Sequence, residues 1–94
     1  MKENSLPFKT AKEMVEDMST EETMFADGFE DAIIGVVERV DFGETIALYD
    51  TDKVIEIIKE RDGLSHEQSV EFFRYNVLGS YVGDGTPAFA TLYV

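Results

Sequence analysis

The chain has 94 residues, and its 20 acidic and 8 basic side chains give a formal charge of −12 at pH 7. Such a charge disfavours nucleic acid and anionic membranes as partners. It favours a partner protein with a basic surface. Alternatively, the charge serves solubility and has no role in recognition. The absence of cysteine excludes disulfides, a thiol nucleophile and thiolate metal ligands. The length predicts one domain over residues 1–94 with a modest core, and an apolar content of 44% is ordinary for a globular protein.

The sequence gives no sign of export or membrane insertion. The N-terminal run MKENSLPFKT lacks the apolar centre of a signal peptide, and no apolar run is long enough to cross a bilayer. We therefore expect a soluble cytoplasmic protein, with residues 1–7 frayed.

The first predicted helix covers about residues 8–18. Phe8, Ala11, Val15 and Met18 recur at helical spacing and form one apolar face. Ser19, followed three residues later by Glu22, has the pattern of a capping box, so we expect it to open a turn or short helix through residues 24 and 25. The pair at positions 27 and 28, Asp-Gly, predicts the turn that closes this segment.

The same region is the most asymmetric in charge. Between residues 13 and 31 there are eight acids and no base. They are Glu13, Glu16, Asp17, Glu21, Glu22, Asp27, Glu30 and Asp31. Without a counter-charge, these side chains should create a local negative potential that attracts basic proteins.

Residues 32–40 and 45–49 are predicted to form an antiparallel hairpin. The first run is rich in β-branched residues and contains Gly35, and a turn-like Asp-Phe-Gly-Glu separates it from the second. A helix remains an alternative for residues 32–40, because Ile33, Val36, Val37 and Val40 also fit one helical face.

Two helices are predicted next, over residues 50–62 and 65–78. Asp50 is a suitable N-cap for the first, and Gly63 suits the left-handed residue after its end. Ser65 and Gln68 form a capping box at the start of the second. A DNA-recognition helix is rejected, because the second helix has Arg74 as its one cation and needs more positive charge to meet phosphate.

The last segment, residues 86–94, is predicted to be a strand. No side chain after Asp84 is charged, so we expect a strand that is buried on both faces or pairs with another chain, and at least a dimer. The element order predicts an α+β fold: a small antiparallel sheet, made of the hairpin and the C-terminal strand, packed with two or three helices.

The sequence contains no recognisable set of catalytic residues. Asp50-Thr51-Asp52 begins like a calcium loop but lacks the later ligands, and the run from Tyr81 to Pro87 lacks the lysine of a phosphate loop. His66, the one histidine, falls at a helix start and is read as a surface residue. We expect no enzyme activity, no metal and no cofactor. The aromatic residues in and after the second helix are predicted to pack in the core or between helix and sheet. They are Phe72, Phe73, Tyr75 and Tyr81. The alternative is that one of them is an interface anchor.

The run YDTDKVIEIIKERDGLSHEQSVEFFRYNVLGSYVGDGTPAF, preceded by DGFEDAIIG, resembles a family of small acidic proteins of bacteriophage and prophage genomes. The resemblance covers roughly residues 27–89. It implies a phage-borne accessory protein in a bacterial cytoplasm and carries over no activity, cofactor or catalytic residue.

These observations favour a protein that binds and blocks a basic surface of a host or defence protein. The candidate partner-binding residues are Glu21, Glu22, Asp27, Glu30, Asp31 and Asp84. The alternative is an accessory or structural protein that self-associates through its C-terminal strand. A small metal- or nucleotide-binding enzyme is a third interpretation.

Overall fold

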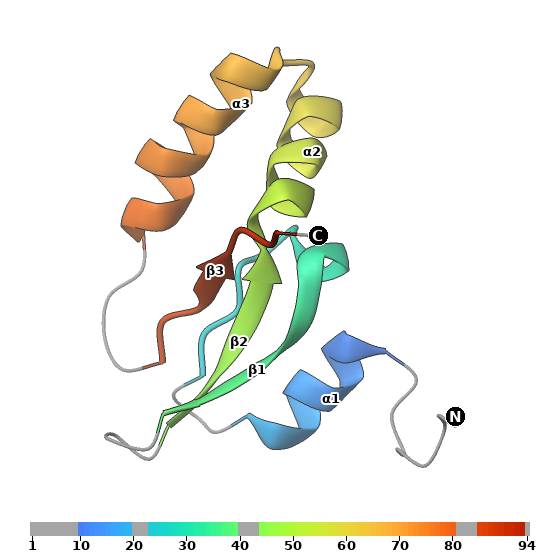
Figure 1. Cartoon of the computed structure of the whole chain (residues 1–94), viewed down its shortest axis with the longest axis vertical. Coiled ribbons are helices and arrows are strands. Elements are labelled where there is room, and N and C mark those ends of the chain that lie inside the picture. The colour runs from blue at the N-terminus through green and yellow to red at the C-terminus, as the bar shows by residue number, and fades with distance from the viewer. Residues whose placement is uncertain (1–9, 20–22, 40–43, 81–84, 94) are drawn as a thin grey trace.

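The computed structural model describes residues 10–19, 23–39, 44–80 and 85–93, and shows an α+β fold with a three-stranded sheet and three α-helices (Figure 1). The predicted fold class is confirmed. In chain order the elements are α1 (Ala11–Met18), the 3-10 turn η1 (Glu30–Ala32), β1 (Ile33–Arg39), β2 (Glu44–Asp50), α2 (Thr51–Asp62), α3 (His66–Phe72), the π-turn η2 (Phe73–Val77), the 3-10 turn η3 (Leu78–Ser80) and β3 (Ala88–Ala90). In Figure 1, α2 and α3 form a helical hairpin beyond one end of the sheet, and α1 lies beside β1.

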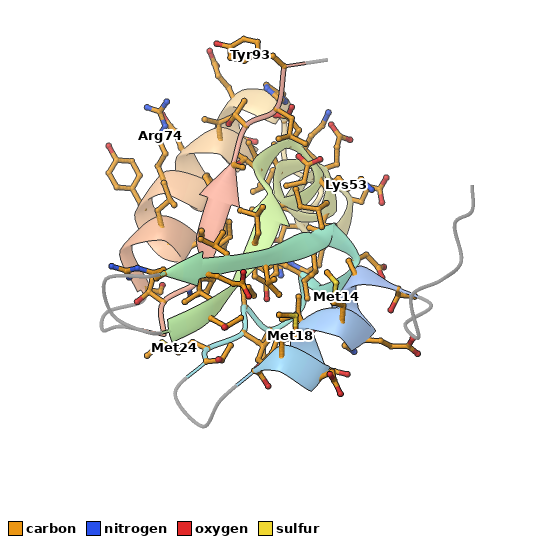
Figure 2. All side chains as sticks on the ribbon, turned by 60° about the horizontal axis from the view of Figure 1, so that its bottom comes forward. Met14, Met18, Met24, Lys53, Arg74 and Tyr93 are labelled. Atoms are coloured by element: carbon orange, nitrogen blue, oxygen red, sulfur yellow. The ribbon has the colours of Figure 1, made fainter. Side chains whose placement is uncertain are left out.

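The helix α1 begins at Thr10, whose hydroxyl accepts a hydrogen bond from the backbone N–H of Glu13 at 3.1 Å. Val15 is buried, and Met14 and Met18 lie between α1 and β1 (Figure 2). Ser19 ends the helix, and its hydroxyl donates to the carbonyl of Glu16 at 2.8 Å. The predicted helix is confirmed over its described residues.

The predicted turn or short helix through residues 24 and 25 is wrong, because the described residues 23–26 form neither and this segment bonds to the sheet region. The hydroxyl of Thr23 donates to the carbonyl of Thr45 at 2.9 Å, and the N–H of Met24 donates to the carbonyl of Gly85 at 2.9 Å. The turn at positions 27 and 28 is confirmed, with Gly28 at a φ of 90° that favours glycine.

The hairpin is confirmed. β1 pairs antiparallel with β2 from Ile33 opposite Tyr49 to Arg39 opposite Glu44, and the register shifts between Ile33 and Gly35. The helical alternative is therefore wrong for residues 33–39. The predicted turn and Val40 lie outside the described residues.

The helical hairpin follows the predicted capping. Asp50 accepts hydrogen bonds from the N–H groups of Asp52 and Lys53, at 3.0 and 3.4 Å, and Gly63 ends α2 at a φ of 65°. The capping box of Ser65 and Gln68 is present in both directions.

The second predicted helix is present, but only its first part, α3, is an α-helix. After Phe72 the chain widens into a π-turn, in which the N–H of Leu78 donates to the carbonyl of Phe73 five residues earlier. Phe73 and Val77 are buried, while the side chain of Tyr75, between them in the chain, is 80% exposed. The core assignment is thus confirmed for Phe73 and wrong for Tyr75, and Tyr81 lies outside the described residues.

The third strand runs parallel to β2, with Leu48 opposite Ala88 and Asp50 opposite Ala90. The sheet is therefore mixed, and the expectation of an antiparallel sheet was wrong for this strand. The reason is that α2 and α3 act as a crossover, which returns the chain to the end where β2 starts. β3 has three residues, and residues 91–93 are exposed and irregular, so the predicted strand buried on both faces is wrong there.

The core is centred on Tyr49, whose side chain is fully buried. Its ring stacks on Phe89 with a centroid separation of 5.3 Å, and Phe89 meets Phe73 edge to face at 5.3 Å. The Tyr49 hydroxyl oxygen accepts a hydrogen bond from the N–H of Ala26 at 2.8 Å. These contacts join β2, β3, the π-turn and the segment before η1.

We expect Phe73→Ala to lower the free energy of unfolding by about 3 kcal/mol or more, because it removes a buried aromatic ring and leaves a cavity beside Phe89. Urea unfolding followed by circular dichroism measures this change. Tyr75→Ala is the control, since its exposed ring should contribute little. Equal midpoints for the two variants would contradict the packing described for η2.

We expect Tyr49→Phe to lower the free energy of unfolding by about 1–3 kcal/mol, because the buried N–H of Ala26 then loses its acceptor while the ring stack remains. Amide hydrogen exchange provides the site-specific measurement. Protection of the Ala26 amide should fall more than protection within α2. An unchanged Ala26 exchange rate would show that this hydrogen bond does not hold the segment.

Candidate functional site

The first candidate site is an acidic surface made by α1 and the turn before β1. We call it the α1–η1 surface and define it by its acids, Glu13, Glu16, Asp17, Asp27, Glu30 and Asp31. The start of α1 lies beside η1, where Thr10, Ala11, Lys12, Glu30, Asp31 and Ile33 line a shallow cavity of about 270 Å³. The fold thus brings the acids of η1 next to the first turn of α1, 18 residues earlier in the chain for Asp31 and Glu13.

The predicted partner-binding residues divide into two groups. Asp27 and Asp31 are exposed, and Glu30 is half-buried, all within this surface. Glu21, Glu22 and Asp84 lie outside the described residues. The α1–η1 surface therefore carries three of the predicted residues and adds the three acids of α1.

Glu30 has a structural role within the turn. Its carboxylate accepts a hydrogen bond from the N–H of Gly28 at 3.1 Å. Hydrogen bonds from the backbone N–H groups of Glu30 itself and of Gly28 hold the pKa of this carboxyl below its ordinary value, and the charge of Lys12 acts in the same direction. Glu30 therefore stays ionised while it closes the turn that presents Asp27 and Asp31.

Among the described residues, Lys12 brings a positive charge to the acidic surface. Its ammonium lies 4.0 Å from the carboxylate of Glu16 and lies close enough to Glu30 to favour its ionised form. Lys12 directly precedes the acidic run of residues 13–31, so the run by itself did not indicate this contact. An ion pair between partly exposed side chains such as Lys12 and Glu16 contributes little to stability.

Arg61 connects the acidic surface to the helical hairpin. Its guanidinium lies over the rings of Phe29 and Phe72, at 5.3 and 5.8 Å from their centroids, and donates two hydrogen bonds to Asp62 at 3.1 and 3.0 Å. The hydrogen bond from Arg61 lowers the pKa of the Asp62 carboxyl. A planar cation between two rings holds the turn against α2 and α3. No sequence signal distinguished Arg61 from a helix-terminal base.

The second candidate site is a groove of about 380 Å³ between α2, α3 and β3, which we call the helical groove. Its apolar lining comes from Ile55, Val70, Phe73, Leu78 and Phe89. Its polar lining comes from Thr51, Asp52, His66, Arg74 and Thr91. An apolar hollow with a few polar groups at its margin is the usual form of a binding site.

The acid and the arginine of the groove come from different helices. Asp52 is in the first turn of α2, and Arg74 is on the helix that continues α3. Neither side chain has an ion-pair partner within residues 10–19, 23–39, 44–80 and 85–93. His66 is exposed at the start of α3, which confirms its reading as a surface residue.

Four large hydrophobic side chains in the last 20 residues are exposed within the described part of the chain. Tyr75 and Leu78 are 80% and 48% exposed, and Leu92 and Tyr93 are 46% and 100% exposed. Leu78 lines the groove, and Leu92 follows Thr91, which also lines it. Sequence reasoning pointed to the C-terminal segment, but it placed Tyr75 in the core.

Within the part of the chain that the structure describes, no group of three or more His, Asp and Glu side chains is arranged to hold a metal ion. The described helices also include none with the length and apolar character needed to cross a bilayer. Comparisons with protein-family profiles, with curated proteins and with solved structures gave no match.

Proposed function

We propose that the protein is a small acidic binding module that covers a basic surface of another protein with its α1–η1 surface. The family resemblance supports a phage-borne accessory role in a bacterial cytoplasm, with a host or defence protein as the target. The proposal is carried by one observation: the acids of the α1–η1 surface project from a segment that is fastened to the core.

Three contacts hold the α1–η1 surface to the core. Val15 holds α1 in the core, and the N–H of Ala26 bonds to the buried hydroxyl of Tyr49. Phe29, beyond the turn, is also buried and lies under the guanidinium of Arg61. Asp27 and Asp31 are therefore presented from a backbone that is ordered before binding, which reduces the entropy lost on association.

Electrostatics supports the class of partner. A protein with 20 acids and 8 bases attracts positively charged surfaces over several ångströms, and such fields raise association rates and select partners of opposite sign. The same field repels nucleic acid and anionic membranes. A basic protein surface is the partner that matches this charge.

The test compares two variants that lose the same charge from different surfaces. One carries Glu13→Gln, Glu16→Gln, Asp17→Asn and Asp31→Asn, and leaves Glu30 in place because its carboxylate closes the turn. The matched control carries Glu56→Gln, Glu60→Gln, Glu67→Gln and Glu71→Gln on the exposed sides of α2 and α3. Both variants gain four units of charge, so a difference between them reports position and not net charge.

A partner captured on the wild-type protein from a bacterial lysate, and then purified, serves as the probe in surface plasmon resonance. We expect the α1–η1 variant to associate about tenfold more slowly or worse, because steering acts on the on-rate. The control should retain most of the wild-type rate, and added salt should slow the wild-type protein toward the α1–η1 variant. Equal rates for the two variants would contradict the proposal and leave the acidity a role in solubility.

A further inference from the structure

The helical groove has the chemistry of a protein interface and not that of the acidic surface. Of its ten lining residues, Asp52 is the one acid and Arg74 the one arginine. Its lining includes the exposed side chains of Leu78 and Arg74 and the aromatic rings of Phe73 and Phe89. Aromatic residues and arginine are enriched in interfaces, whereas aspartate and glutamate are depleted there.

The two charges of the groove make it complementary to itself. Asp52 comes from α2 and Arg74 from η2, and neither has an ion-pair partner among the described residues. When two identical surfaces meet around a two-fold axis, residue i of one copy meets residue j of the other, and j meets i. A surface with one such acid and one such base therefore offers two matched ion pairs to a second copy.

The C-terminal segment supplies an apolar group to fill the groove. The described chain leaves the groove at Thr91 and continues into Leu92 and Tyr93, which are 46% and 100% exposed. Figure 2 shows Tyr93 at the outer edge of the molecule. No side chain after Asp84 is charged, so this end of a chain with a charge of −12 can approach another copy without bringing further acids.

We propose that the helical groove is the docking site of a second copy of this chain. The two copies are related by a two-fold axis, Leu92 of each enters the groove of the other, and Arg74 of each pairs with Asp52 of the other. This contact is independent of the basic partner proposed above. It uses a different face, and Arg74 would repel a strongly basic protein there.

Sedimentation velocity over a concentration series tests the contact. The wild-type protein should show a reversible monomer–dimer equilibrium. Arg74→Asp should weaken the dimer at least tenfold, because it sets two acids against each other at both symmetric positions. Asp52→Arg should do the same with two bases. Leu92→Ser should weaken the dimer independently of these charges.

Mixing the two charge variants tests directly whether Arg74 of one copy pairs with Asp52 of the other. In a pair made of one Arg74→Asp chain and one Asp52→Arg chain, both ion pairs are restored with reversed or native polarity. The mixture should therefore form a dimer that neither variant forms alone. Circular dichroism establishes that each variant is folded, and Asp52→Lys, which carries the same reversed charge, replaces Asp52→Arg should the latter lose its helix signal.

Lys53→Asp is the matched control, since it makes the same charge change as Arg74→Asp. Lys53 is exposed in the first turn of α2, does not line the groove, and lies on a different side of the molecule from Arg74 (Figure 2). It should dimerise like the wild-type protein. Three results would each overturn the proposal: a wild-type protein that stays monomeric at about 1 mM, an Arg74→Asp variant that dimerises normally, or a mixture of folded charge variants that stays monomeric.

Discussion

The buried ring of Tyr49 is the contact on which the remaining structure depends. It is the residue before the cap of α2, so its position sets where the helical hairpin leaves the sheet. Its ring packs on Phe89 of β3, and its hydroxyl oxygen accepts the N–H of Ala26. The side chain of Tyr49 thus connects β2 to β3 and to the segment before η1, next to the start of α2. A hydrogen bond to a buried backbone group also specifies a position more sharply than apolar contact alone, because an unpaired N–H in the core is costly.

Both candidate surfaces follow from this arrangement. On the side of Ala26, the segment is held so that Asp27 and Asp31 point outward from an ordered turn. On the side of Phe89, the ring contact with Phe73 forms the apolar lining of the helical groove. The first surface is rich in carboxylates, and the second has one acid and an unpaired arginine. A single small core therefore supports two faces of different chemistry, which suits a module that self-associates through one and binds a basic partner through the other.

The local features of this fold were predictable from sequence, and the non-local ones were not. Asp50, Gly63 and the Ser65–Gln68 pair act within one helical turn, so their spacing alone predicts both helices. The hairpin followed from β-branched residues on either side of a turn. The direction of β3 depends on how the helical hairpin packs, which no short pattern records. The π-turn from Phe73 to Val77 has no short signature in the sequence either. Tyr75 lies two residues from both buried positions and therefore faces away from the core, which the helical spacing could have indicated.

The two candidate sites likewise combine features that the sequence indicates with features that depend on tertiary structure. The acidity around Asp27 and Asp31 was visible as a run of charges, but its contact with α1 and the presence of Lys12 came only from tertiary structure. The groove could not have been predicted, because its lining residues come from α2, the helix around Arg74, and the C-terminal segment. Arg61 is in the last turn of α2, where a base is common, and its position over Phe29 and Phe72 depends on segments far apart in the sequence.

We propose that the acidity acts from the α1–η1 surface and not from the whole molecule. Titration with a lysine-rich peptide, followed through the backbone amide chemical shifts in NMR spectra, tests this proposal. The shifts should concentrate in α1 and in residues 27–31, with small changes in α2 and α3 although these helices also carry exposed acids. Shifts spread evenly over the acids of all three helices would contradict it.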